Sequence, residues 1–279
     1  MMVSVIVPCY NQGQYVVETL ESVRRQTYTD FECIVVNDGS TDDSLQKIAD
    51  FCKSDARFKY IDKANEGVSI ARNSGIKESK GKYLLPLDAD DILAPDYLSK
   101  TVAIMEVRPD VKVVCTNTRM FGIKNADYDL PEYDYARLIC RNILVCTALF
   151  RREDFDKTDG YNPAMVEGME DWDFWLSFLK EDDVVVRLDE HLFFYRIKSD
   201  SRNQSAFRQS YARLRKQIWE NHRDIYARHF FNPMESDEYQ TLIHSKEYRV
   251  GKMFSPLLNS KWCSWLFAFI GRYGSKQPC

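Results

Sequence analysis

The chain has 279 residues, of which 44% are hydrophobic and 29% charged, values typical of a soluble globular protein with one large domain or one domain plus an appendage. Its net charge of −4 argues against a dedicated nucleic-acid binder. The eight cysteines form no Cys-x-x-Cys pair, and no basic segment precedes the apolar run that begins at Val3. We therefore expect a cytoplasmic protein with reduced thiols rather than a secreted, disulfide-bonded or zinc-binding one.

The first third of the chain alternates predicted strands with predicted helices. Buried strands are expected where apolar and β-branched residues run together, at 3–7, 31–36, 58–61 and 83–87. Helices are expected at 15–26, 42–52 and 69–78, the last with Gly81 placed as its C-terminal cap. This order predicts an α/β fold with a mostly parallel sheet covered by helices.

The second half of the chain is less regular. It predicts strands at 111–116, 144–150, 184–188 and 192–197, and a helix at 171–180 whose Trp172 and Trp175 face the core. From about residue 207 the pattern is helical and basic, because 12 Lys and Arg stand against 6 Asp and Glu from Asn203 onward.

Polar residues follow each of the first four predicted strands, at 8–11, 37–42, 62–67 and 88–91. In parallel α/β sheets ligands bind beyond the carboxyl ends of the strands, so these segments predict the rim of one cleft. No Gly-x-Gly-x-x-Gly follows the first strand, and the sequence has no P-loop motif. Dinucleotide dehydrogenases and P-loop enzymes are therefore disfavoured.

The acidic cluster after the fourth strand is the most informative of these segments. If the chain stays extended, Asp88 and Asp90 point to the same side, with Cα atoms about 6.5–7 Å apart. Two such carboxylates repel each other unless a cation lies between them, and oxygen ligands without Cys or His suit Mg²⁺ or Mn²⁺. The alternative is a solvated acidic turn that caps a helix beginning near Pro95.

Five segments in this order resemble the family 2 glycosyltransferases, inverting enzymes of the GT-A fold. They are 3–11, 35–42, 65–73, 88–91 and 170–173, and the resemblance extends over roughly residues 3–205. It implies a GT-A fold and the transfer of a sugar from a nucleotide-sugar, most simply a UDP-sugar, to an acceptor hydroxyl. We accordingly place the catalytic domain at 1–205, with a nucleotide-sugar-binding half at 1–105 and an acceptor half at 106–205, and a helical C-terminal extension at 206–279.

The resemblance implies that the first strand ends line the nucleotide and that Asp38 contacts the base or ribose. An aromatic ring can stack on uracil, and a carboxylate can accept a hydrogen bond from its imide N–H or from a ribose hydroxyl. Asp38 also lies in Asn-Asp-Gly-Ser, a common turn sequence, so a structural role is the alternative. The predicted donor-binding residues of these strand ends are Pro8, Tyr10, Asn11, Asp38, Lys63, Asn65 and Gly67.

The family also implies that Asp90 ligates a Mn²⁺ or Mg²⁺ ion directly, with Asp88 as the second ligand and a contact of the ribose. Arg72 would face the acidic cluster and the diphosphate, where it could brace a carboxylate or bind phosphate. A surface arginine on a helix is the alternative. Many relatives carry a histidine where this chain has Lys198, which cannot ligate a cation but could contact phosphate.

Asp171, beside Glu170, is the predicted general base that removes the acceptor hydroxyl proton. Its place at a helix start favours the ionised carboxylate, whereas Glu170 and Asp173 oppose ionisation. Helix capping is the alternative role for Asp171.

The apolar run 262–270 is too short to span a bilayer, but with its flanking lysines and arginines it could lie on an anionic membrane surface. Peripheral contact through 252–276 at the inner face of the cell membrane would suit a lipid-linked saccharide acceptor in surface polysaccharide synthesis. Packing onto the main domain, or self-association as a homodimer, is the alternative.

Two rival functions remain at this point. A sugar-1-phosphate nucleotidyltransferase would usually begin with a glycine-rich loop bearing Lys or Arg, which residues 8–13 are not. A non-catalytic nucleotide-sugar-binding or scaffold protein would not need Asp171 and Asp90, both of which are present.

Overall fold

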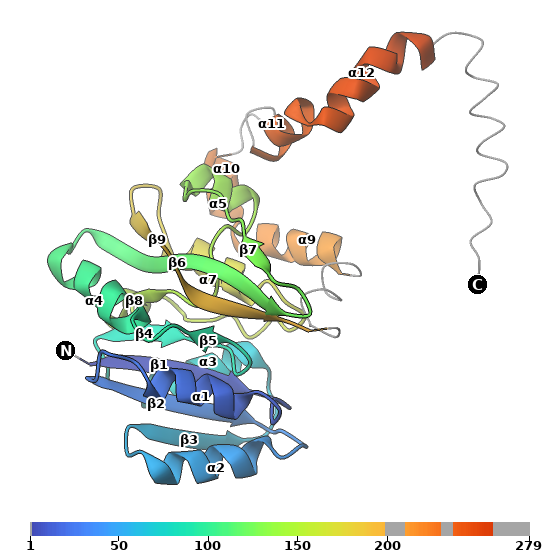
Figure 1. Cartoon of the computed structure of the whole chain (residues 1–279). Helices are drawn as coiled ribbons and strands as arrows, with labels where there is room; N and C mark the ends of the chain where they lie inside the picture. Colours follow the sequence, from blue (N-terminus) through green and yellow to red (C-terminus); the bar gives the residue numbers. More distant parts are fainter. Residues whose placement is uncertain (1, 199–209, 230–236, 259–279) are drawn as a thin grey trace, which may run out of the picture. The chain divides into compact units, whose positions relative to one another are not determined.

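The computed structural model describes residues 2–198, 210–229 and 237–258 (Figure 1). Its contacts divide the chain into two compact units, Met1–Tyr226 and Ala227–Cys279. The domain boundary predicted at residue 205 lies in the segment 199–209, outside the described residues, and stays a prediction.

The first unit is built on one mixed sheet, which has nine strands in the described part of the chain, eight of them in the order β3-β2-β1-β4-β8-β6-β9-β5. Its regular portion is parallel and consists of β3 (Phe58–Lys63), β2 (Phe31–Asp38), β1 (Val3–Cys9) and β4 (Tyr83–Pro86). All residues of β1 and β2 are buried, as expected of strands covered on both faces.

The remaining strands make the sheet mixed. The antiparallel β8 (Leu149–Arg151) joins β4 to β6 (Val111–Gly122), which runs parallel to β9 (Val184–Ile197). The two-residue β5 (Ile92–Leu93) pairs with β9, and β7 (Ala126–Tyr128) pairs with β6. The prediction of a mostly parallel sheet is confirmed, because the long strands β6 and β9 also pair in parallel and the antiparallel pairs involve only the short strands β5, β7 and β8.

Helices cover both faces of the parallel portion. Alternate residues of β1 pack with α1 (Val16–Arg24), α2 (Ser44–Ser54) and α4 (Tyr97–Val107) in the main hydrophobic core. On the opposite face α3 (Val68–Glu78) packs against β1 and β2, so closely that a Cβ at Gly75 would lie 2.6 Å from Ile6. Glycine at residue 75 thus allows the helix to approach the sheet.

An aromatic core lies in the second half of the first unit. Phe150 of β8 packs against Phe174, Trp175 and Phe178 of α7 (Glu170–Phe178), with ring centroids 5.2–5.9 Å apart. Trp172 and Trp175 are buried, as predicted. Aromatic packing of this kind fixes the axis of α7 against the sheet.

Several expected boundaries differ from the structure. Helix α3 ends at Glu78 with an extended Ser79, so Gly81 is not its C-terminal cap. The expected strands 184–188 and 192–197 form the single strand β9, and 144–150 contains only the short β8. Strand β4 ends at Pro86, before the acidic cluster.

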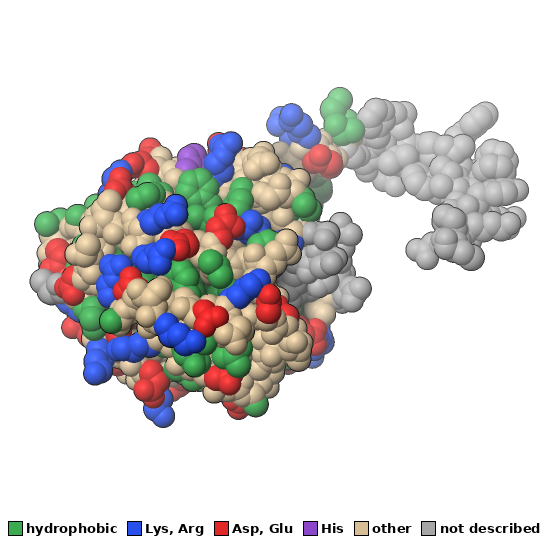
Figure 2. All heavy atoms as spheres, turned by 60° about the horizontal axis from the view of Figure 1, so that its bottom comes forward, with side chains coloured by type: hydrophobic (Ala, Val, Ile, Leu, Met, Phe, Trp, Pro, Cys, Tyr) green, Lys and Arg blue, Asp and Glu red, His purple; other side chains and the backbone are tan. Residues whose placement is uncertain are grey.

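The other helices of the described residues lie within the second half of the sheet's sequence or after it. They are α5 (Tyr135–Cys140), α6 (Arg152–Phe155), α9 (Tyr211–Asn221) and α10 (Arg223–His229), followed in the second unit by α11 (Asp237–His244) and α12 (Lys246–Leu258). On the face shown in Figure 2, Lys and Arg side chains are interspersed with Asp and Glu, so this face presents no field of one sign.

Candidate active site

The ends of β1 and β2 are tied together by Asn11. Its backbone is left-handed, with φ of 52°, and its Oδ1 accepts a hydrogen bond of 2.7 Å from the Thr41 amide. The Asn11 amide in turn donates to Ser40 Oγ at 3.0 Å. Tyr10 beside it is 48% exposed and can offer its ring to a ligand, whereas Pro8 lies buried within β1.

Asp38 holds the loop that leads into α3. Its carboxylate accepts hydrogen bonds from Lys63 Nζ at 2.8 Å and from the amides of Glu66 and Gly67 at 3.1 and 2.9 Å. Gly67 has φ of 92°, a conformation that favours glycine, and Asn65 is exposed in the same loop. The structure therefore brings the predicted Asp38, Lys63, Asn65 and Gly67 together. It also gives Asp38 the structural role that the turn sequence indicated as the alternative.

The three carboxylates of the acidic cluster do not continue the strand. They form a turn in which the Asp91 amide donates to the Asp88 carbonyl at 3.1 Å, so the expected extended alternation of Asp88 and Asp90 is wrong. Each carboxylate has its own partner. Asp88 accepts from Arg72 Nη2 at 2.7 Å, Asp90 contacts Lys198 Nζ at 2.5 Å, and Asp91 accepts from the Arg196 amide at 2.8 Å.

The ends of β4 and β9 meet at Asp90. Burial, and then the negative charge of Asp88, raise the pKa of Asp90, while Lys198 acts in the opposite direction. Lys198 Nζ also donates to Gln12 Oε1 at 3.0 Å, which links β9 to the loop after β1. A positive charge at this position is therefore stabilising, and Lys198 supplies one.

Arg72 is the central residue of the site. It is 1% exposed, which excludes the surface-arginine alternative, and its two terminal nitrogens bind different carboxylates. Nη2 donates to Asp88, and Nη1 donates to Glu170 Oε1 at 3.2 Å, while the guanidinium lies over the Tyr161 ring. One buried side chain thus connects the acidic turn after β4 with the first residue of α7.

Asp171 follows Glu170 at the start of α7 and keeps part of its surface accessible. Asn142 Nδ2 donates to Asp171 Oδ2 at 2.9 Å, and the Trp172 amide donates to Oδ1 at 2.8 Å. Burial, and then the charge of Glu170, raise the pKa of Asp171 to about 6, against the opposing effect of Arg72. A carboxylate with this pKa is mostly ionised at neutral pH and can accept a proton.

Sequence reasoning missed two residues of this site. Asn142 orients Asp171, and nothing in its local sequence indicates this. Arg196 donates from Nε to the Asp90 carbonyl at 2.7 Å and packs over the rings of Tyr15 and Phe121. Nothing in the sequence around Arg196 indicates that it fixes the acidic turn.

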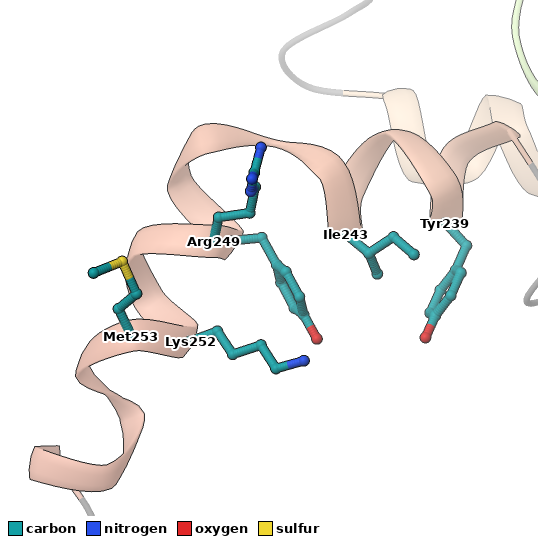
Figure 3. A pocket seen from close by; sticks show the side chains of 6 residues that line it. Tyr239, Ile243, Arg249, Lys252 and Met253 are labelled. Carbon is teal, nitrogen blue, oxygen red and sulfur yellow. The ribbon is translucent and has the colours of Figure 1, made fainter.

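The second unit contains a groove of its own, between α11 and α12 (Figure 3). It is lined by Tyr239, Ile243, Tyr248, Arg249, Lys252 and Met253, none of which belongs to the cluster around Arg72. The apolar run 262–270 lies outside the described residues. In the ranges the structure describes, no helix combines the length and hydropathy that crossing a bilayer requires.

Comparison with known proteins extends these observations. Residues 4–165 match the family described as "Glycosyl transferase family 2". An uncharacterized glycosyltransferase, EpsJ, of Bacillus subtilis is 31% identical over 222 residues, covering 74% of this chain and 64% of its own. Chondroitin synthase of Escherichia coli is 30% identical over 182 residues, covering 63% of this chain and 26% of its own. The chain thus spans less than two thirds of either curated relative.

Among solved structures, Staphylococcus aureus TarS 1–349 in complex with UDP-GlcNAc superimposes with a TM-score of 0.68. It shares 22% sequence identity, and the match covers 91% of this chain and 73% of that one. At this identity the similarity establishes the fold, which is the predicted GT-A architecture. Because the family match spans more than half of the chain, and EpsJ is similar over three quarters of it, the protein belongs to glycosyl transferase family 2.

Proposed function

We propose that the protein transfers a sugar from a UDP-sugar to an acceptor hydroxyl by a single inverting displacement, with Asp171 as general base. The observation that carries this proposal is the buried Arg72, which binds Asp88 on one side and Glu170 on the other. This bond network supports a predicted diphosphate site and a predicted base that lie close together. The family match ends at residue 165, before α7, so the assignment of Asp171 rests on the resemblance of residues 170–173 and on this geometry.

The donor would lie along the ends of β1, β2 and β3. Tyr10 offers an exposed ring on which the nucleotide base could stack. Asp38 holds the loop after β3, which contains Asn65 and Gly67, through its bonds to Lys63 and to the Gly67 amide. TarS, which has the same fold, binds UDP-GlcNAc, and this supports a UDP-sugar as the donor class.

Asp88 and Asp90 would hold a Mn²⁺ or Mg²⁺ ion. Within the described ranges no set of three or more His, Cys, Asp or Glu side chains could hold a metal, so the protein offers two carboxylates. This donor set fits ions that complete their shell with water and substrate phosphate, and the burial and negative charge that raise the pKa of Asp90 support a cation there. When bound, the ion would supply Lewis-acid stabilisation of the charge on the leaving nucleotide.

The chain's own residues would carry the proton transfer. Asp171 accepts the acceptor hydroxyl proton as that oxygen bonds to the anomeric carbon and the bond from this carbon to the diphosphate breaks. Asn142 and the Trp172 amide each occupy one Asp171 oxygen and fix the carboxylate plane while lone pairs stay open to the acceptor. Lys198 would contact the departing diphosphate, and the buried Arg72 would brace Asp88.

The acceptor is proposed as a saccharide or lipid-linked saccharide in polysaccharide synthesis, by analogy with chondroitin synthase. Membrane contact through residues 252–276, a homodimer and the catalytic domain at 1–205 stay predictions. The non-catalytic scaffold is disfavoured by the pKa of Asp171, which suits a base at neutral pH.

The decisive variant is Asp171→Asn, which keeps the size of the side chain and removes its basicity. We expect turnover with a panel of UDP-sugars and Mn²⁺ to fall by roughly 10²–10⁴-fold while the affinity for UDP, measured by calorimetry, stays the same. Asp159→Asn, at an exposed carboxylate, is the matched control and should keep full turnover. Unchanged turnover in Asp171→Asn would falsify the proposed base.

A further inference from the structure

Helix α7 begins without a local cap. Its N-cap residue, Met169, is left-handed with φ of 60° and makes no side-chain hydrogen bond to the first turn. The first amides of a helix have no partner within the helix, and side-chain caps normally stabilise them. The start of α7, from which Glu170 and Asp171 project, must therefore be held by contacts with other segments.

One of these contacts comes from the α9–α10 corner, Asn221 and His222. Asn221 Nδ2 donates to Asp173 Oδ1 at 2.7 Å, and His222 Nε2 lies 3.0 Å from the same oxygen. Asp173 is 2% exposed and His222 8%, so the contact between them is shielded from water, whereas Asn221 is exposed and its bond only partly buried. Asp173 also closes the first turn of α7, because its amide donates to the Met169 carbonyl at 3.0 Å.

The corner is itself firmly anchored to the acceptor half. Leu214 and Ile218 of α9 are buried, and Arg215 donates to the Cys140 carbonyl at 2.6 Å while its guanidinium lies over the Trp172 ring. Tyr226 of α10 donates to the Ile139 carbonyl at 2.9 Å. The two helices thus bridge α5 and α7 within the first unit.

We infer that the α9–α10 corner positions the catalytic base: Asn221 and His222 hold Asp173, and through it the first turn of α7 that carries Asp171. This inference rests on the proposed base role of Asp171. It assigns a function to a segment beyond residue 165, where the family match ends. Asn221 and His222 are positioning residues, since they touch Asp173 and neither Asp171 nor the acidic turn in the bonds described.

The loops that would hold the nucleotide base and ribose are held within the donor side, because the bonds of Asp38 run to residues 63–67 and those of Asn11 to Ser40 and Thr41. The acidic turn is linked to α7 through Arg72 and Glu170. Loosening the start of α7 should therefore slow the chemical step far more than it weakens UDP binding. A misplacement of about 1 Å in a reacting group can cost roughly 10²-fold in rate.

The test compares His222→Ala and Asn221→Ala with Val102→Ala, which removes a buried side chain from α4, outside both the corner and the candidate site. Three quantities are measured on the full chain: turnover with the best UDP-sugar of the panel, UDP affinity, and hydrogen exchange of the α7 amides. For the first two variants we expect turnover to fall roughly 10- to 100-fold, UDP affinity to change less than twofold, and the first-turn amides of α7 to exchange faster.

Two further measurements separate positioning from general stability. His222→Gln, whose amide nitrogen can replace Nε2, and imidazole added to His222→Ala should each recover part of the turnover. Val102→Ala should lower the melting temperature yet keep its turnover below that temperature.

The inference is overturned if His222→Ala loses no more turnover than Val102→Ala, or if exchange in α7 stays at the wild-type rate. Failure of the proposed function would look different. In that case Asp171→Asn would keep its turnover, and faster exchange in the His222 and Asn221 variants would still show that the corner holds α7.

Discussion

The two sides of the candidate site are held together in different ways. On the donor side, Asn11 and Asp38 bind residues about 30 positions away, in loops that follow neighbouring strands of one parallel sheet. On the base side, Glu170 is held from α3, 98 positions earlier, and Asp173 from the α9–α10 corner, 49 positions later. The donor side is thus a product of regular sheet topology, whereas the base side is assembled from segments scattered along the chain.

This difference has an energetic consequence. The donor-side bonds are largely neutral or combine one charge with backbone amides, apart from the ion pair of Asp38 with Lys63. The link between the two sides is instead a buried guanidinium between two carboxylates. A buried charge that loses its partner is costly, so the connection should be the most sensitive point of the site.

The largest expected effect is that of Arg72→Met on stability. It leaves Glu170 buried without its guanidinium partner and Asp88 without its ion pair, so we expect the free energy of unfolding in urea to fall by about 3–5 kcal/mol. Lys47→Ala, which removes a half-exposed ion pair with Asp43 on the donor side, should cost at most about 1 kcal/mol. Equal losses in the two variants would show that Arg72 is not the main link.

Asp38→Asn should have the next largest effect. The asparagine amide keeps one acceptor oxygen, but its NH₂ group faces a backbone N–H of residues 66–67. The ion pair with Lys63 is also lost, so we expect the free energy of unfolding to fall by about 1–3 kcal/mol. Because this loop borders the donor site, we also expect weaker UDP binding by calorimetry. Asp43→Asn, at a largely exposed carboxylate, is the control and should bind UDP as the wild type does. Normal UDP affinity in Asp38→Asn would show that Asp38 stabilises the fold and has no part in UDP binding.

The sequence predicts the donor side of the site better than the base side. The four polar strand ends, the place of Asp38 and the proximity of Arg72 to the acidic cluster all follow from the rule that parallel strands end at one edge. The extended geometry assumed for Asp88 and Asp90 failed because β4 ends two residues before the cluster and the chain turns there.

The base side was predictable only in part. Residues 170–173 identified Asp171, and the buried tryptophans were assigned to the core correctly. Asn142, Asn221 and His222 were missed, because each meets α7 through tertiary packing that no local pattern encodes. Burial was also missing from the sequence-based account of the pKa of Asp171, which weighed only the helix start and its acidic neighbours.

The pH dependence of turnover tests the electrostatics of the base side. The pKa of Asp171 is about 6, and the ionised form is the base, so turnover should fall about tenfold for each pH unit well below 6 and level off above it. Since the charge of Glu170 helps to raise this pKa, Glu170→Gln should move the midpoint to lower pH. Buffers of constant ionic strength and saturating donor give the profile. If the midpoint of the pH profile is unchanged in Glu170→Gln, the fall in turnover at low pH does not come from protonation of Asp171.

The smallest effects come from the two left-handed residues, one on each side of the site. Asn11 suits φ of 52° because its short polar side chain tolerates this conformation and accepts the Thr41 amide, so Asn11→Gly should lose about 1 kcal/mol with that bond. Met169 has φ of 60° but makes no capping hydrogen bond with its side chain. In Met169→Gly the relief of backbone strain should stabilise the fold by about 1–2 kcal/mol. This slightly exceeds the cost of about 0.4–1 kcal/mol from the entropy that glycine adds to the unfolded chain. Urea unfolding should therefore give changes of opposite sign for the two variants. A loss above about 2 kcal/mol in Met169→Gly would mean that packing of the methionine side chain, rather than tertiary bonds to the first turn, holds the start of α7.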